Sequence, residues 1–106
     1  MNVQLKKGSL TMIVLAFIGQ EKQYGYQLAQ NVSKYIEIAE GTLYPLLRRL
    51  VKEEHLSTTL VESSEGPARK YYELTESGKE YLQSLVKEWD IYTEAVTQIL
   101  DETGTK

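Results

Sequence analysis

Hydrophobic residues recur at helical spacing in three segments of the first half of the chain. The first segment predicts a helix over residues 8–19 that is closed by Gly19, with apolar positions at Leu10, Ile13, Val14, Phe17 and Ile18. A shorter pattern predicts a second helix from Tyr24 to about residue 34, and a leucine stripe predicts a third that starts between residues 39 and 42. Pro45 fits the first turn of this third helix, where its missing N–H is not needed.

The pattern changes to period two after Glu54. Apolar or β-branched residues alternate over residues 56–61, and residues 69–74 follow as a second strand with Tyr71 and Tyr72 on opposite faces. The turn-forming residues 64–67 lie between them, so the sequence predicts one β-hairpin. Thr75 is placed to cap a following helix, and Glu76 suits the positive end of its dipole.

The last helix has the most regular pattern in the chain. Its apolar seam alternates steps of four and three residues through Gly78, Leu82, Leu85, Trp89, Tyr92, Val96 and Ile99. A helix over residues 76–102 would be about 40 Å long, longer than a chain of this size can cover with its own residues. We therefore expect the seam to be covered by the same helix of a second copy, in a homodimer.

Composition narrows the class of protein. The 106 residues are 42 % hydrophobic and 25 % charged, which suits one globular domain with a modest core. The absence of cysteine excludes disulfides, thiolate metal sites and thiol nucleophiles, and it is typical of a cytoplasmic protein. The longest apolar run, residues 12–18, is too short to cross a bilayer, so we expect no membrane span.

Catalysis finds little support in the sequence. His55 is the only histidine, and we expect it to end the third helix, so neither a metal site nor a Ser-His-Asp triad can be assembled around it. No glycine-rich phosphate loop is present. The sequence therefore predicts neither an enzyme nor a cofactor.

The order of the elements indicates a mainly α fold with a small β-hairpin. Three helices, a hairpin and a long helix describe a winged helix-turn-helix, in which the third helix would enter the major groove of DNA and the hairpin would be the wing. We expect residues 1–75 to form the DNA-binding domain, residues 76–102 a C-terminal dimerisation helix, and residues 103–106 a disordered tail.

Cations and hydrogen-bond donors suited to DNA phosphates lie on the third helix and the hairpin. Thr42 and Tyr44 are near the start of that helix, and Arg48 lies four residues beyond Tyr44 on the same face. Arg49 is turned about 100° further round, where it can pair with Glu53. The predicted DNA-contacting residues are Lys6, Lys7, Thr42, Tyr44, Arg48, Arg69 and Lys70.

Four blocks of the chain resemble the PadR-like transcriptional regulators. They read LTMIVLA from Leu10, YGYQL from Tyr24, EGTLYPLLRRL from Glu40 and GPARKYYELT from Gly66. The resemblance implies a homodimeric repressor that binds a pseudo-palindromic operator on double-stranded DNA. The single short C-terminal helix is similar to that of a subgroup that includes multidrug-sensing regulators.

In that subgroup, a tryptophan from each subunit flanks a pore at the dimer interface where flat aromatic compounds stack, and Trp89 occupies the matching position. The resemblance implies that a small aromatic or planar cationic effector binds at this interface. The residues assigned to the interface and the effector site are Leu82, Leu85, Trp89, Tyr92, Val96 and Ile99. A tryptophan on an apolar seam is by default a packing residue, and the two roles are compatible.

One interpretation from another class stays open. The formal net charge of −3 is untypical of DNA binding, although most of the negative charge lies in residues 76–106 and the N-terminal half is slightly basic. Winged helices also serve as dimerisation adaptors. A protein-interaction module that does not bind DNA is therefore the alternative.

Overall fold

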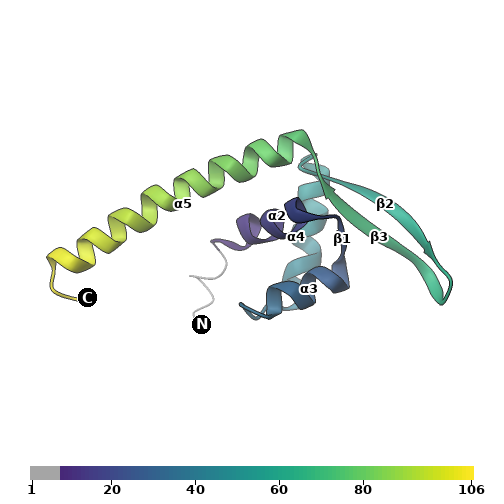
Figure 1. Cartoon of the computed structure of the whole chain (residues 1–106), viewed down its shortest axis with the longest axis horizontal. Coiled ribbons are helices and arrows are strands. Elements are labelled where there is room, and N and C mark those ends of the chain that lie inside the picture. Colours follow the sequence, from purple (N-terminus) through teal and green to yellow (C-terminus); the bar gives the residue numbers. More distant parts are fainter. Residues whose placement is uncertain (1–7) are drawn as a thin grey trace.

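The computed structural model describes residues 8–106. Within that range it contains the helices α2 (Leu10–Gln20), α3 (Gly25–Ser33), α4 (Glu40–Lys52) and α5 (Glu76–Glu102), together with the strands β1 (Gln23–Tyr24), β2 (Leu56–Ser63) and β3 (Gly66–Leu74). The arrangement is the expected winged helix-turn-helix followed by a long helix (Figure 1). The predicted helices are confirmed, with ends that differ by one or two residues, except that α4 ends at Lys52, three residues before His55.

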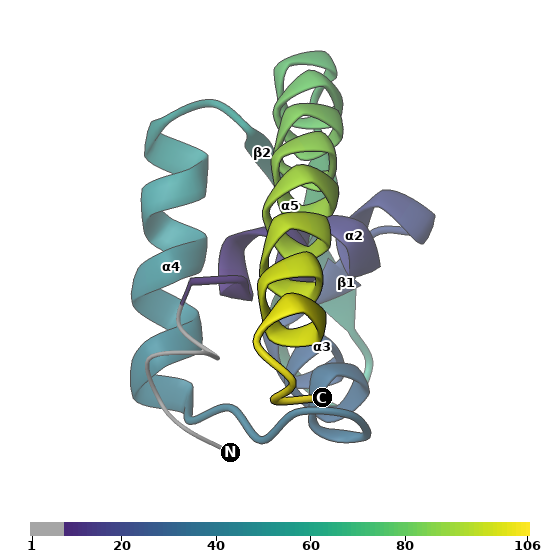
Figure 2. The same cartoon turned by 90° about the vertical axis from the view of Figure 1, so that its left-hand side faces the viewer.

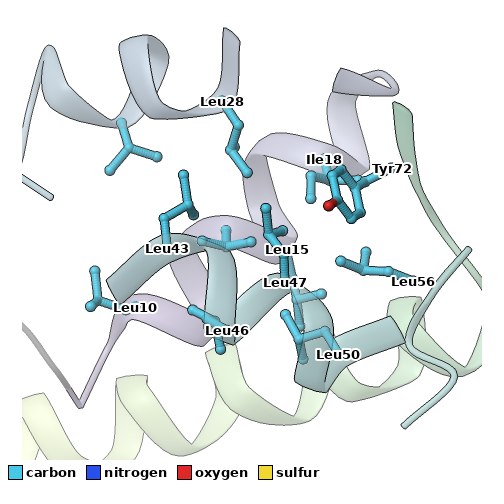
Figure 3. Close-up of a cluster of buried hydrophobic side chains, with 12 residues drawn as sticks. Leu10, Leu15, Ile18, Leu28, Leu43, Leu46, Leu47, Leu50, Leu56 and Tyr72 are labelled. Atoms are coloured by element: carbon cyan, nitrogen blue, oxygen red, sulfur yellow. The ribbon is translucent and has the colours of Figure 1, made fainter. Parts of the chain in front are cut away.

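A cluster of leucines joins α2, α3 and α4 into one core (Figure 3). Each helix contributes the apolar stripe that its periodicity predicts, because residues three and four apart share one face. Strand residues close the core on one side. Its members are Leu10, Val14, Leu15, Ile18, Leu28, Val32, Leu43, Leu46, Leu47, Leu50, Leu56 and Tyr72.

The sheet has three antiparallel strands in the order β1-β3-β2, one strand more than the predicted hairpin. The extra strand β1 is only two residues long, too short for a periodic pattern to reveal. Its Gln23 is almost fully buried, and the side-chain amide donates to the carbonyl of Phe17 at 2.8 Å and accepts from Asn31 at 3.0 Å. These bonds satisfy a buried polar side chain and tie β1 to α2 and α3.

The β2-β3 hairpin extends well beyond the core (Figure 1). The turn is confined to Ser64 and Glu65, so both strands are longer than predicted. Leu60 pairs with Lys70 and Val61 pairs with Arg69. The two cations therefore lie directly beyond the residues of β3 that pair with β1.

Both ends of α5 lie where the sequence predicts, because both caps are local. The Thr75 hydroxyl accepts from the Gly78 N–H at 2.9 Å at the N-terminus. At the C-terminus Gly104 has a φ of 69° and donates to Asp101, while Thr105 donates to Leu100. This Schellman pattern satisfies the last carbonyls of the helix and ends it.

The start of α5 packs tightly against the segment that follows α4. A Cβ added to Gly78 would collide with the carbonyl oxygen of His55, so only glycine fits at this position. The His55 ring stacks on Tyr81 with centroids 4.3 Å apart, and its Nδ1 lies 2.9 Å from the Ser77 hydroxyl. His55 was predicted to end the third helix. The last helical residue of α4 is Lys52, and the His55 N–H donates to the Leu50 carbonyl at 2.9 Å while Glu54 has a φ of 65°, so His55 closes the C-terminal cap of this helix and directly precedes β2.

The hairpin and the free end of α5 extend to opposite sides of the helical core, and the molecule measures 58 × 28 × 20 Å (Figure 1). In the end-on view α5 passes in front of α2, with α4 standing to one side (Figure 2). None of the helices in residues 8–106 is long and apolar enough to cross a membrane.

Candidate nucleic-acid interface

Helix α4 presents a polar face to solvent because its leucines face the core. Thr42 and Arg48 are both exposed on it, as the periodicity predicts. Arg48 has no hydrogen bond or ion pair with another residue of the range 8–106. The neighbouring Arg49 donates to the Thr11 hydroxyl at 3.2 Å and lies 3.8 Å from the Glu53 carboxylate, which confirms the predicted pairing. Arg48 is therefore the arginine of this pair that is free to meet a phosphate.

Tyr44 packs between the two helices of the helix-turn-helix and is only half-exposed. A Cβ added to Gly25, at the start of α3, would lie 2.9 Å from the Tyr44 hydroxyl and 2.5 Å from its ring. The glycine therefore allows α3 and α4 to approach closely. Tyr44 was predicted only as a phosphate contact, and its packing against Gly25 was not predicted.

A hollow of about 220 Å³ lies between the start of α3, α4 and the hairpin. It brings together Tyr44, Arg69 and Lys70, three of the predicted DNA-contacting residues, which are up to 26 positions apart in the chain. Tyr24 and Tyr26 also line it. Local periodicity carries no functional signal for these two tyrosines, because the contacts of β1 and α3 with β3 join segments far apart in the chain. Lys6 and Lys7, the remaining predicted contacts, lie outside the described residues.

Tyr72, which also lines this hollow, is affected by its burial and by the charges of two α4 residues. Burial raises the pKa of Tyr72 above its ordinary value of 10.0, Tyr44 acts in the same direction, and the positive charge of Arg48 opposes both. Tyr72 is 7 % exposed and lines the floor of the hollow. Arg69 and Lys70 line the hollow, and the charge of Arg48 acts on Tyr72, so three cations lie on this part of the head, as we call residues 8–75.

The seam of α5 divides into two parts. Leu82 and Leu85 are half-buried and pack against the core. Beyond them Trp89, Tyr92 and Ile99 are 45 %, 67 % and 58 % exposed, and Val96 is half-buried. The structure therefore places the first two predicted interface residues on the head and leaves the outer part of the seam largely exposed.

A second hollow, of about 180 Å³, lies where α5 crosses the start of α2. Trp89 and Tyr92 line one side and Met12 lines the other, while Glu88 is its charged residue. The sequence interpretation included the two aromatic residues but missed Met12 and Glu88. Met12 and Glu88 come together only because α2 and α5, which are far apart in the chain, cross at this point.

The family model for the PadR-like transcriptional regulators matches residues 14–84, which contain the helix-turn-helix, the hairpin and the start of α5. The chain belongs to this family. The resemblance noted from the four sequence blocks is thus confirmed, and this PadR-like protein is a DNA-binding transcriptional regulator and not an enzyme.

This PadR-like chain is similar in sequence to a protein of Lysinibacillus sphaericus and in structure to solved PadR regulators. An uncharacterized protein of Lysinibacillus sphaericus is 40 % identical over 87 residues, which cover 78 % of this chain and 80 % of the relative. The crystal structure of a PadR-like transcriptional regulator from Bacillus cereus is 39 % identical, covers 92 % of this chain and 96 % of that one, and has a TM-score of 0.82. A PadR family regulator from Eggerthella lenta is 32 % identical with a TM-score of 0.86, and the similarity covers 92 % of this chain and 87 % of that one.

Proposed function

We propose that this PadR-like protein is a cytoplasmic homodimeric repressor that binds a pseudo-palindromic operator and is released by a planar aromatic effector. The observation that carries the proposal is the exposed outer seam of α5. Trp89, Tyr92 and Ile99 together offer an apolar surface that a monomer would leave in water. A second copy of the same helix covers such a seam by symmetry, since each stripe is complementary to itself.

The DNA-binding arrangement follows from the two ends of the dimer. With the α5 helices paired, each head presents the exposed face of α4 to one major groove, and the half-sites are spaced by about one helical turn of roughly 34 Å. Thr42 and Arg48 face the DNA from α4, and Arg69 and Lys70 follow the backbone from the hairpin. The acidic α5 residues, such as Glu94 and Asp101, lie on the helix that extends to the other side of the core from the hairpin.

The hollow beside Trp89 supports the effector part of the proposal. Its indole and the Tyr92 ring provide apolar faces for a flat aromatic compound, and Glu88 favours a compound that carries a positive charge. A ligand stacked there would change the crossing of α5 over α2. A small change in that angle shifts the spacing of the two heads and weakens operator binding. Linkage then requires effector and DNA to weaken each other's binding by the same factor.

Sedimentation and footprinting test the proposal together. We expect a dimer at micromolar concentration and a protected, two-fold symmetric site in the DNA upstream of the protein's own or neighbouring genes. Planar cationic dyes should quench Trp89 fluorescence and reduce the protection of the DNA site. A monomer that protects no symmetric site would overturn the dimeric repressor, whereas a dimer unaffected by any such dye would overturn only the effector.

A further inference from the structure

The solvent-facing side of the sheet carries a row of alternating cations and rings. Tyr24 of β1 pairs with Tyr71 of β3, and their rings meet edge to face with centroids 5.4 Å apart. The Arg69 guanidinium carbon lies 4.7 Å from the centre of the Tyr24 ring, and the Lys22 ammonium lies 5.7 Å from that of Tyr71. Both distances are within the range of cation–π attraction.

Arg69 is exposed and sits where β3 has lost its β1 neighbour, because β1 pairs only with Tyr71 and Tyr72. A free arginine there would sample many rotamers, and fixing it on DNA would oppose binding. Arg69 has no carboxylate partner among residues 8–106 that could hold it. The Tyr24 ring is thus the contact that restricts its guanidinium.

A guanidinium held over an aromatic ring keeps its donors available. The ring of Tyr24 attracts the positive charge of Arg69 without accepting a hydrogen bond from it, and the Arg69 N–H groups make no hydrogen bond to residues 8–106. The edge of the guanidinium is the part that forms paired hydrogen bonds with phosphate oxygens. The contact with Tyr24 therefore lowers the entropy of Arg69 without using the atoms that a phosphate needs.

We propose that Tyr24 is a positioning residue for DNA binding: its ring holds Arg69 at the rim of the hollow between α3, α4 and the hairpin, with the guanidinium edge directed at a backbone phosphate. This inference rests on the proposed placement of the hairpin along the duplex. Strand β1, which the sequence did not reveal, would then order a DNA-contacting residue of the hairpin.

A double-mutant cycle tests the pairing, with fluorescence anisotropy on a short mixed-sequence duplex at low ionic strength. Arg69→Gln should weaken binding about tenfold, the loss expected for a charge-assisted hydrogen bond. Tyr24→Leu should weaken binding about threefold, as expected for an exposed cation–π contact, and should add no loss once Arg69 is already glutamine. Tyr24→Phe keeps the ring and should bind like the parent.

Two further variants separate positioning from folding and from net charge. Arg69→Lys keeps the charge but loses the planar fork, so we expect it to reproduce the effect of Tyr24→Leu on binding without altering β1. Lys22→Gln removes a cation from the same face at the end distant from the hairpin tip, and it should change affinity less than twofold. Thermal unfolding of each variant shows whether the head remains folded.

The outcomes are distinct. Additive losses for Arg69→Gln and Tyr24→Leu, an equal loss for Tyr24→Phe, or an equal loss for Lys22→Gln would each overturn the positioning role while leaving DNA binding intact. A parent protein that binds no duplex at low ionic strength would overturn both this inference and the proposed function. Non-additive losses with rescue by phenylalanine support the role of Tyr24.

Discussion

The head and the outer part of α5 carry the same kind of apolar stripe, but the stripe is buried in the head and exposed on α5. In the head, Leu15, Leu28 and Leu47 are completely buried because three helices and the sheet surround them. On α5, Trp89 and Tyr92 follow an equally regular stripe, yet about half or more of each side chain is exposed. The difference lies in what is available to cover the stripe and not in the stripe itself.

This comparison shows what amphipathic spacing can and cannot reveal. Spacing identifies the face of a helix that will be buried, because burial of apolar area is the dominant favourable term in folding and in association. It does not say whether the cover comes from the same chain. For α5, helix length shows that the cover must come from elsewhere, since a helix of 27 residues is longer than a head of this size can cover.

The largest expected effect concerns the uncovered stripe. Changing Tyr92→Glu and Ile99→Glu together would place unpaired charges in the proposed interface, so we expect dimer dissociation to increase by about 1,000-fold or more, about 4 kcal/mol. Sedimentation velocity at micromolar concentration measures the change. Gln98→Glu is the matched control because it adds a charge to the polar face of the same helix. An undiminished dimer in the double variant would place the interface elsewhere.

The next effect concerns the covered stripe. Leu47→Ala should lower the free energy of unfolding by about 3 kcal/mol, because it removes a fully buried side chain and leaves a cavity. Urea denaturation measures it. Leu60→Ala is the control, since Leu60 is 68 % exposed on the hairpin and its truncation should change stability by less than about 0.5 kcal/mol. Equal losses from the two leucines would contradict the assignment of the core.

Local signals account for the parts of the fold that the sequence predicted well. Helix α5 begins and ends where Thr75 and Gly104 indicate, because a cap involves residues only a few positions apart. Strand β1 was missed because two residues carry no periodicity and its partner Tyr72 is about fifty positions away.

The same distinction applies to the site. Periodicity placed Thr42 and Arg48 on the exposed face of α4, and the structure agrees. It could not reveal that Tyr44 packs on Gly25 or that the Arg69 guanidinium lies over the Tyr24 ring, since each contact joins segments that only the tertiary fold brings together. Family resemblance identified the blocks in which these residues lie but not how they touch.

The junction between the head and α5 offers a third test. Gly78→Ala should destabilise the protein by about 2 kcal/mol, because the added methyl group collides with the carbonyl oxygen of His55 and must displace backbone. Gly41→Ala in α4 is the same substitution with nothing within 4 Å, and better helix propensity should make it neutral or stabilising by up to about 1 kcal/mol. Thermal unfolding of the two variants shows whether each substitution lowers or raises the stability of the protein. Two stabilised variants would show that α5 does not dock through Gly78.

A smaller effect separates the two adjacent arginines of α4. Arg48→Ala should weaken duplex binding about tenfold, about 1.4 kcal/mol, because its unpaired guanidinium is available to a phosphate. Arg49→Ala should weaken binding less than about threefold, since Arg49 already contacts Thr11 and Glu53. Anisotropy titrations at one fixed salt concentration compare them. Full affinity in the Arg48 variant would show that Arg48 does not contact a phosphate, whereas a parent protein that binds no duplex would favour the protein-interaction adaptor.

The smallest effect lies within the head core and appears only at alkaline pH. Because burial raises the pKa of Tyr72, the unfolded chain releases this proton first as pH rises. The stability that the neutral phenol contributes is therefore complete below the ordinary pKa of 10.0 and is lost as pH rises through the raised value. Tyr72→Phe should match the parent within about 1 kcal/mol at neutral pH and lose less stability above pH 10. Identical alkaline profiles, measured by urea denaturation at each pH, would show that Tyr72 ionises as readily in the folded head as in the unfolded chain.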